Sequence, residues 1–284
     1  MKFHNSTADA FVPDGQPLEA ALTRITHLGI GAHQDDLEFM AFHGIAACYD
    51  NGFEWFGGVT CTNGAGSART GAYAGFTDAQ ITDLRRKEQQ RAAALGHYAA
   101  MIQLDYPSAC IKDPTDSRLR EDLKALIEAA SPRVVYTHNP ADKHDTHVAV
   151  AVQVIEAIRA LPAHKRPEAV HGCEVWRDLD WMPDTEKIIH DVSGHESLAA
   201  ELGGVFGSQI AGGKRYDLAV LGRRRANATF LESHSVDRSD AVSFAMDLTP
   251  LVREEALDIA AYVGGYIDRF KSDVTARLAR QMKK

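Results

Sequence analysis

The stretch from Ile25 to Glu38 reads ITHLGIGAHQDDLE and runs from an apolar segment directly into side chains that can bind metal. Its apolar part, residues 25–30, predicts a buried strand, so His33, Asp35 and Asp36 follow the carboxyl end of that strand. In α/β sheets, ligands bind at this edge. The stretch therefore predicts a strand, a turn and a binding site in succession.

A second polar segment, residues 139–147, reads NPADKHDTH and precedes an apolar helical pattern. His144 and His147 are three positions apart, so they share a face if both stand on the first turn of that helix. One imidazole could then bind a metal while the other faces the substrate. Each segment alone also has an ordinary interpretation, because Asp35 or Asp36 could simply cap a helix and histidines at this spacing occur on surfaces.

Taken together, the two segments contain the parts of a mononuclear metal hydrolase site. A catalytic zinc site uses three imidazole or carboxylate ligands and keeps one position open for water. His33, Asp36 and His147 would provide these ligands. Asp35 lies next to a ligand without being needed as one, so it could take the proton of the attacking water as a general base.

His144 would complete this catalytic group. In its protonated form it could stabilise the oxyanion and then give a proton to the leaving amine. Asp142 or Asp145 could keep it charged, because a nearby carboxylate favours the protonated imidazole.

These motifs resemble those of the LmbE-like, PIG-L-like N-acetylglucosaminyl deacetylase superfamily. His33-Gln34-Asp35-Asp36 looks like its His-x-Asp-Asp signature, and residues 139–147 resemble its Asn-Pro-x-Asp-x-His-x-x-His stretch. Residues 85–96 are similar to the family's Arg-x-x-Glu helix that ends in Leu-Gly, and residues 208–210 and 223–225 look like its carboxyl-terminal part. The resemblance covers nearly the whole chain.

The resemblance implies the same roles: His33, Asp36 and His147 as zinc ligands, Asp35 as the base and His144 as the residue that steadies the tetrahedral intermediate. This chain also departs from the family pattern. Gln34 replaces the usual Pro, and Thr146 stands where an Asp often precedes the last ligand, which leaves Asp142 as the better candidate to orient His144. Asp142 also occupies the place of a Tyr that donates to the oxyanion in some members, and an ionised Asp cannot donate.

Strand-like and helical patterns alternate along the chain, which predicts an α/β fold: a Rossmann-like, mostly parallel sheet with helices on both faces. The expected strands are residues 25–30, 55–62, 101–104, 133–137, 169–176 and 187–192. The expected helices between them are residues 78–95, 117–130 and 147–161. A mixed α/β extension of the same domain, residues 196–284, should contain helices at 196–206 and 215–221, a short strand at 229–234 and a long terminal helix at 251–280.

Composition predicts one domain over residues 1–284, with residues 1–20 as an amino-terminal arm that could pack on a neighbouring subunit. The chain is 45% hydrophobic and 25% charged, with a formal net charge of −8, which disfavours nucleic acid as a partner. We find no apolar run long enough for a membrane and no secretion signal, so a cytoplasmic protein is expected. The four scattered cysteines predict no disulfides, and the arm is compatible with a homo-oligomer.

The loop at residues 63–75 should lie beside the metal, because it follows the second strand at the same edge of the sheet. Asn63 and Arg69 are candidate substrate-binding residues there, since Arg69 is the only charged side chain in the loop and the family places a sugar-binding arginine in the corresponding loop. Trp176 could stack on a sugar ring, although a core or interface role is equally compatible with the sequence.

Other enzyme classes lack their motifs. The pair Gly29-x-Gly31 has Gln34 at the third glycine position of a dinucleotide fingerprint, and the chain contains no Gly-x-Ser-x-Gly. We therefore expect a zinc-dependent hydrolase, with another divalent metal left open, that removes acetyl from an N-acetylglucosamine-containing small molecule or oligosaccharide. The alternatives are a zinc amidase acting on another amide, such as a thiol conjugate, and a noncatalytic metal and sugar binder.

Overall fold

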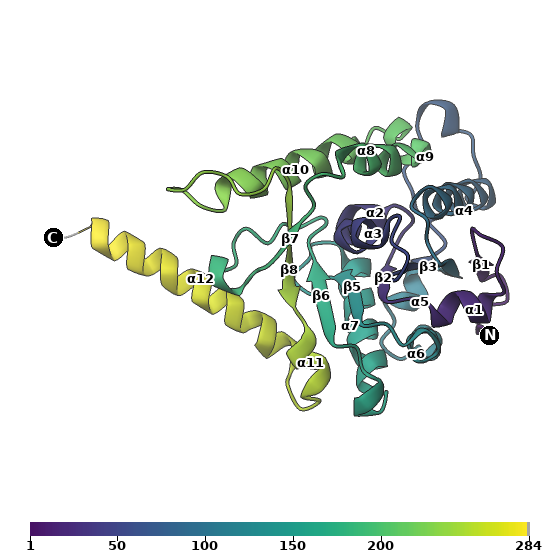
Figure 1. The fold of residues 1–284 in the computed structure, drawn as a ribbon, viewed down its shortest axis with the longest axis horizontal. Coiled ribbons are helices and arrows are strands. Elements are labelled where there is room, and N and C mark those ends of the chain that lie inside the picture. The colour runs from purple at the N-terminus through teal and green to yellow at the C-terminus, as the bar shows by residue number, and fades with distance from the viewer. Residues whose placement is uncertain (283–284) are drawn as a thin grey trace.

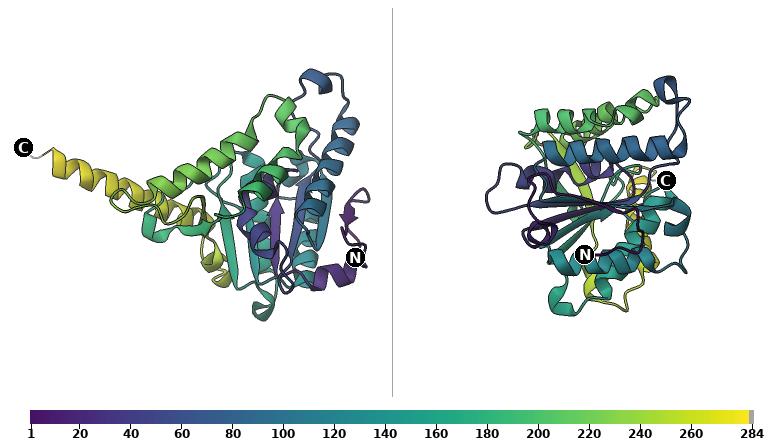
Figure 2. Two further views of the ribbon diagram at one scale, coloured as in Figure 1. Left: turned by 45° about the horizontal axis from the view of Figure 1, so that its top comes forward. Right: turned by 90° about the vertical axis from the view of Figure 1, so that its right-hand side faces the viewer.

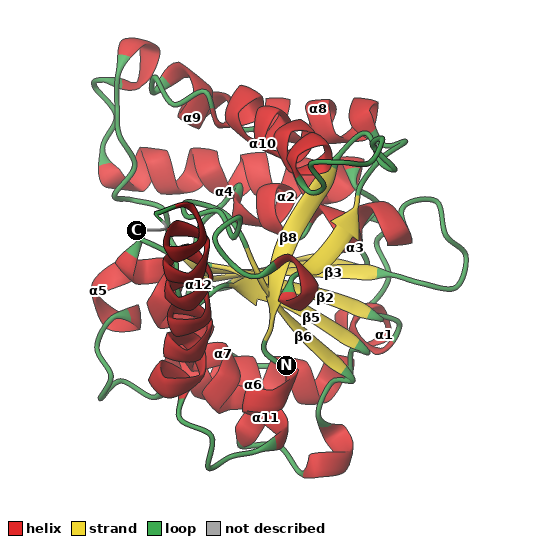
Figure 3. Ribbon diagram, turned by 90° about the vertical axis from the view of Figure 1, so that its left-hand side faces the viewer, coloured by secondary structure: helices red, strands yellow, loops and turns green. Residues whose placement is uncertain are grey.

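A computed structural model describes residues 1–282 of the chain. In this part of the chain the strands form one eight-stranded sheet in the order β1-β4-β3-β2-β5-β6-β8-β7. The five strands from β4 to β6 are parallel, whereas β1, at one edge, pairs antiparallel with β4, and β8 pairs antiparallel with β6 and β7. Figure 3 shows helices on both faces, with α4, α8 and α10 on one side and α6, α7 and α11 on the other.

The strands are β1 Asp9–Phe11, β2 His27–Gly31, β3 Phe56–Thr62, β4 Ala100–Tyr106, β5 Val134–His138, β6 Ala169–Cys173, β7 Ile188–Asp191 and β8 Val242–Asp247. The helices are α1 Leu18–Thr23, α2 Asp36–Met40, α3 Phe42–Cys48, α4 Asp78–Leu95, α5 Ser108–Ile111, α6 Arg118–Ala130, α7 Asp145–Arg159, α8 Glu196–Gly204, α9 Gly207–Ala211, α10 Tyr216–Phe230, α11 Thr249–Arg253 and α12 Ile259–Gln281. Short 3-10 turns are η1 Gly71–Tyr73, η2 Ala163–Lys165 and η3 Asp184–Glu186. Figure 1 shows their arrangement.

The predicted α/β fold with a mostly parallel sheet is confirmed. Every predicted strand up to residue 192 has a counterpart, and helix α4 occupies the predicted range. Thr77 caps α4 by accepting from the backbone N–H of Gln80, whose side chain in turn accepts from the N–H of Thr77. Strands β2 and β3 are buried on both faces, which explains their continuous apolar character.

The carboxyl-terminal part differs from the prediction in two places. The short strand expected at residues 229–234 does not form, because α10 continues to Phe230, and the strand of this region is β8 instead. The long terminal helix is divided into α11 and α12 at residues 254–258, where Asp258 caps α12 by accepting from the N–H of Ala261. The side chain of Asp258 thus caps the start of a new helix, whereas the apolar periodicity alone predicted one continuous helix through this position.

The amino-terminal arm packs on its own chain. Residues 9–11 form β1 and pair with residues 101–103 of β4, while His4 contacts the buried carboxylate of Asp122 through its ring Nδ1 at 2.9 Å. These contacts within the same chain account for the position of the arm without a neighbouring subunit. Within residues 1–282, no helix combines the length and apolar composition needed to cross a bilayer.

Close packing between β2 and β3 depends on Gly29. A Cβ atom added to Gly29 would lie 2.6 Å from the Phe56 ring and 3.0 Å from Leu37. Both neighbours are buried in the core, with Phe56 and Leu37 inaccessible to solvent. A side chain at this position would therefore force core groups apart.

A group of histidines surrounds Tyr136 on the face of the sheet covered by α3. His43 Nδ1 lies 3.0 Å from the Tyr136 hydroxyl, and His190 Nε2 lies 3.0 Å from His171 Nδ1. The rings of His43 and His190 are stacked at 4.4 Å. Burial lowers the pKa of all three histidines, and that of His171 falls from 6.5 to about 4. The fold therefore favours the neutral forms of these three histidines.

Gly29→Ala should destabilise the fold by about 1–3 kcal/mol, because the new methyl group overpacks the junction of β2 and β3. Thermal or urea unfolding measures the change. Gly52→Ala is the matched control, since a Cβ there meets no atom within 4 Å. Equal stabilities of the two variants would contradict this packing argument.

The free energy of unfolding should fall as the pH drops from about 6.5 toward 4. A histidine whose folded pKa is lowered binds its proton first in the unfolded chain, so acid in this window favours unfolding. Urea titrations at several pH values measure the slope, and His171→Gln should flatten it. An unchanged slope in His171→Gln would show that this histidine is not responsible.

Candidate metal centre

The site forms where two segments that are distant in sequence meet at one edge of the sheet. Strand β2 pairs in parallel with β5, with Ile30 beside Thr137, so the loops that follow both strands emerge together. His33 and Asp35 lie in the turn after β2, and Asp36 begins α2. The first turn of α7 contributes His147.

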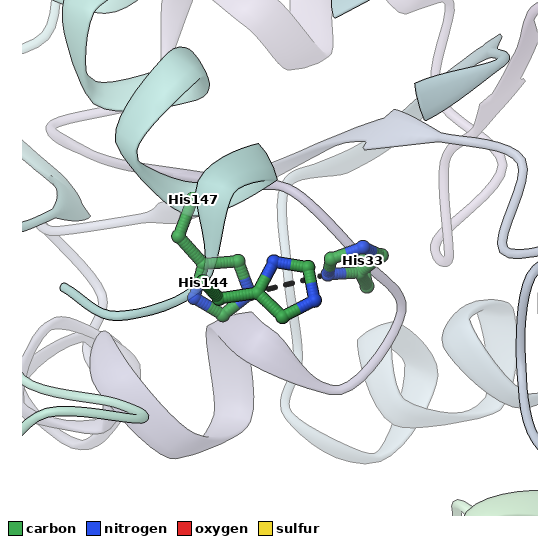
Figure 4. Close-up of side chains that lie close together, drawn as sticks. All are labelled: His33, His144 and His147. Carbon is green, nitrogen blue, oxygen red and sulfur yellow. Dashed lines mark hydrogen bonds between the residues drawn. The ribbon is translucent and has the colours of Figure 1, made fainter. Parts of the chain in front are cut away.

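The three predicted ligands lie close to one another. His33 Nδ1 lies 3.3 Å from Asp36 Oδ2 and 3.2 Å from His147 Nε2, and His147 Nε2 lies 3.5 Å from Asp36 Oδ1. Donors at about 2.0–2.1 Å from a tetrahedral ion stand about 3.3 Å from one another. Each of these distances is compatible with a shared metal ion, with Asp36 presenting Oδ2 to His33 and Oδ1 to His147. Figure 4 shows the imidazoles of His33, His144 and His147 grouped together.

Asp36 is the charged centre of this group. It is buried, and its Oδ2 accepts from the backbone N–H of His33 at 2.6 Å. Burial opposes ionisation of Asp36, but His147 and His138 outweigh it and hold its pKa well below the usual range. Burial likewise opposes protonation of His147, but the Asp36 and Asp142 carboxylates raise its pKa. These shifts favour the ionised form of Asp36 and the protonated form of His147.

His138 is a member of the cluster that sequence reasoning missed. It ends β5, is inaccessible to solvent, and its Nε2 lies 3.3 Å from Asp36 Oδ2 and 2.9 Å from the backbone nitrogen of Ala32. Asp36, His138 and His147 form a second possible ligand set alongside His33, His144 and His147. One sequence feature could have identified His138: it stands at the carboxyl end of a predicted strand, as His33 does.

Asp142 contacts both histidines of its segment in different ways. Its Oδ1 accepts from the backbone N–H of His144 at 3.0 Å, and its Oδ2 lies 3.6 Å from His147 Nδ1. The carboxylate therefore faces the ring of His147 rather than that of His144. Asp145, the other candidate for orienting His144, is exposed, and within residues 1–282 it forms no ion pair with a histidine. A carboxylate behind a histidine ligand fixes its tautomer and orientation.

Asp35 lies beside the ligands in an unusual backbone conformation. Its φ is +103°, in the left-handed region, and its backbone N–H donates to Gln89 Oε1 at 3.2 Å. Burial raises the pKa of Asp35 well above the usual range, although Arg85, whose guanidinium lies 3.6 Å away, opposes this shift. Arg85 is itself buried and donates to the carbonyl of Gln34. A carboxylate with a raised pKa is suited to accept and return a proton.

The ring of His144 lies beside the rings of His147 and His33. It stacks on His147 at 4.4 Å and meets the edge of His33 at 5.0 Å. Burial, together with His147 and His33, lowers its pKa, and its Nδ1 has no hydrogen-bond partner in the described part of the chain. The lowered pKa favours the neutral imidazole of His144, whereas the sequence suggested a protonated form.

A cavity of about 330 Å³ opens above these groups. Its floor contains His33, Asp35, Asp36, Arg85 and His144, and its wall includes Phe39, Trp176, Lys214, Tyr216 and Arg223. The wall aromatics form a row, in which Trp176 lies 6.0 Å from His144 and 5.8 Å from Tyr216. Trp176 therefore lies in the cavity.

Asn63 and Arg69, in contrast, do not line this cavity. Arg69 donates to the carbonyl oxygens of Phe76 and Ala65 and pairs with Asp78, so its guanidinium holds its own loop together. Asn63 accepts from the N–H of Ala65 at 3.1 Å within the same loop. The placement of Arg69 near substrate rested on position in a glycine-rich loop, which does not fix the direction of a side chain.

Comparison with known proteins agrees with these motifs. Residues 28–158 match the PIG-L family model, described as GlcNAc-PI de-N-acetylase. No curated protein matches the chain by sequence.

Solved structures share the fold at low identity. N,N'-diacetylchitobiose deacetylase from Pyrococcus horikoshii is 18% identical, with a TM-score of 0.57 over 77% of this chain and 82% of that chain. The deacetylase of the antimicrobial A40926 pseudoaglycone is 15% identical, with a TM-score of 0.58 over 79% and 97%. GalB, a 4-carboxy-2-hydroxymuconate hydratase from Pseudomonas putida KT2440, is 16% identical, with a TM-score of 0.58 over 79% and 96%. Residues 28–158, which contain the converging histidines and aspartates, therefore form a PIG-L family domain within the LmbE/PIG-L fold.

Proposed function

We propose that this protein is a metal-dependent N-deacetylase that acts on an N-acetylglucosamine-containing small molecule. The observation that carries this proposal is the convergence of His33, Asp36 and His147 at 3.2–3.5 Å, with Asp35 and His144 opening onto the same cavity. The family match and the deacetylases that share the fold support the same reaction.

A divalent cation, with zinc as our first choice, would be held by His33, Asp36 and His147. When bound, it would polarise the amide carbonyl and acidify a water molecule to a pKa of about 7. The set of two imidazoles and one carboxylate is typical of catalytic zinc sites. Asp142 would keep the Nε2 atom of His147 free of its proton by facing the opposite ring nitrogen.

In the proposed reaction Asp35 carries out the proton transfers, and His144 stabilises the oxyanion. Asp35 takes a proton from water as the water oxygen bonds to the acyl carbon. The neutral imidazole of His144 donates one N–H to the oxyanion that forms. Asp35 then returns its proton to the nitrogen as the C–N bond breaks, which releases acetate and an amine. The lowered pKa of His144 favours this hydrogen-bonding role over the acid role predicted from the sequence.

The cavity limits the substrate only in general terms. An acetamide reaching the floor would place the rest of the substrate against Trp176 and Tyr216, which offer flat faces for a sugar ring. Lys214, whose Nζ lies 5.4 Å from the centre of the Trp176 ring, adds a cation beside that surface. A zinc amidase acting on another amide is the second candidate, and the hydratase that shares the fold shows that the fold alone does not choose between reactions.

Asp35→Asn should retain bound metal and lose nearly all turnover, a decrease of about 10²–10⁴-fold for loss of a general base. Asn tolerates positive φ, so the turn should keep its shape. Acetate release from N-acetylglucosamine, chitobiose and a thiol-linked N-acetylglucosamine conjugate is measured in parallel for the wild-type protein and for Asp83→Asn, an exposed control. Near-normal turnover in Asp35→Asn would contradict the assignment of the base. Release from none of these substrates by a metal-loaded wild-type protein would favour another amide.

Asp142→Asn should weaken metal binding by about 10–100-fold, because it removes the carboxylate that orients His147. His147→Ala should abolish stoichiometric binding. Calorimetric titration with Zn²⁺ measures both effects, with Asp145→Asn as the matched control that removes the same charge three positions away. Equal affinities of Asp142→Asn and Asp145→Asn would contradict the orienting role.

A further inference from the structure

A second cavity lies between α3, α8 and α10 and shares no lining residue with the cavity above the metal centre. Figure 2 shows α8 and α10, both in green, on the same face of the sheet. The second cavity has a volume of about 160 Å³. An apolar cavity of about 150 Å³ holds benzene, so there is room here for a ligand of roughly six non-hydrogen atoms. Most of the lining is apolar: Phe42, Val192, Ala199, Ala200, Leu221 and Ala241.

Arg224, on α10, brings a buried positive charge to this cavity. It is 4% exposed, and among residues 1–282 no carboxylate lies within ion-pair distance of its guanidinium. Burial lowers the pKa of Arg224 from 12.5 to about 10, while the charge of Glu174 opposes the shift. The guanidinium therefore stays protonated at neutral pH. A buried charge without a counter-ion is unfavourable, so an anion beside Arg224 would stabilise the protein.

The carboxylates nearest to Arg224 are engaged elsewhere. Glu196 lines the same cavity, but its side chain pairs with the exposed Arg225 at 2.8 Å. Glu174 is buried and accepts three hydrogen bonds, one from the side chain of Asn227 and two from backbone N–H groups. The described chain thus leaves Arg224 without an anionic partner of its own.

Contacts with the backbone occupy only one of the three guanidinium nitrogens of Arg224. Nη2 donates to the carbonyl oxygens of Glu38 and Phe39, at 3.0 Å each, in the last turn of α2. Nε is buried and has no hydrogen-bond partner in the described chain. Nη1 also lacks a partner among these residues but, unlike Nε, it is not shielded from solvent. The guanidinium carbon lies 4.5 Å from the centre of the Phe42 ring. The group is therefore fixed in place with donors unused, which lowers the entropy lost on binding.

We propose that the second cavity binds a small monocarboxylate with a short apolar chain, whose carboxylate accepts a hydrogen bond from Nη1 of Arg224. A charge-assisted hydrogen bond of this kind is stronger than one between neutral groups. The apolar chain would lie against the side chains of Phe42, Ala199 and Leu221. Inorganic phosphate supplies the charge, but its other oxygens would face apolar side chains without hydrogen-bond partners. The site is independent of the proposed catalytic function.

Calorimetric titration of the full-length protein with butyrate tests the proposal. Butyrate should bind at one saturable site at the second cavity, with a Kd of about 1 mM or lower. Butyramide has the same shape without the charge, and it should bind at least about tenfold more weakly. Inorganic phosphate should also bind at least about tenfold more weakly than butyrate. No saturable binding of butyrate below about 10 mM, or affinities for butyramide or phosphate that equal that for butyrate, would overturn the proposal.

Variants locate the bound butyrate. Ala199→Leu fills the second cavity and leaves Arg224 in place, so it should raise the Kd for butyrate by at least about tenfold. Ala276→Leu makes the same change at an exposed position of α12 and should bind butyrate as the wild-type protein does. Arg224→Gln should remove the preference for butyrate over butyramide, with circular dichroism confirming that the variant is folded. Unchanged binding in Ala199→Leu would place the ligand elsewhere, the metal centre included, and would overturn the proposal.

Crystals soaked in butyrate test the contact itself. Electron density for the ligand should lie in the second cavity, with a carboxylate oxygen within hydrogen-bond distance of Arg224 Nη1. Density at the metal centre alone would contradict the proposal. None of these measurements depends on turnover, so their outcome is separate from that of the proposed N-deacetylase reaction.

Discussion

The buried carboxylate of Asp36 is the group on which the architecture of the site depends. It lies between the imidazoles of His33, in the turn after β2, His138, at the end of β5, and His147, on the first turn of α7. A buried anion is costly unless cations or hydrogen-bond donors surround it. The parallel pairing of β2 with β5 brings these partners together. The same arrangement brings nitrogen and oxygen donors close together, and the proposed cation site rests on this clustering.

Sequence patterns predicted the central part of this structure well. The apolar strand before His33 and the polar residues after it define a strand that ends at a binding edge, and the structure places Asp36 and His147 together as that pattern requires. Buried parallel strands and capped helices leave strong local signals, as Thr77 shows at the start of α4. The positions of side chains on such elements follow from the elements themselves, so the proximity of Asp36 and His147 could be predicted from the sequence.

The remaining features depend on contacts that sequence patterns do not encode. Arg69 turns back onto its own loop, and Asp142 faces His147 rather than the ring of His144. Arg69 is held by hydrogen bonds within its own loop and by Asp78, and Asp142 accepts from the backbone N–H groups of His144 and Trp176, so neither direction follows from spacing. His138 was missed because it has no second metal-binding residue at a regular spacing, although it stands at the carboxyl end of a predicted strand. The break before α12 arises from capping by Asp258, which interrupts an otherwise continuous pattern.

The central claim is that His33, Asp36 and His147 hold one divalent cation at the floor of the cavity. Anomalous X-ray diffraction from crystals grown with Zn²⁺ tests it most directly, since data above and below the zinc absorption edge locate the metal without assumptions about ligands. The account predicts one strong anomalous peak per chain, bounded by these three side chains and facing Asp35. A peak ligated by His138 in place of His33, or no peak at this position, would contradict it.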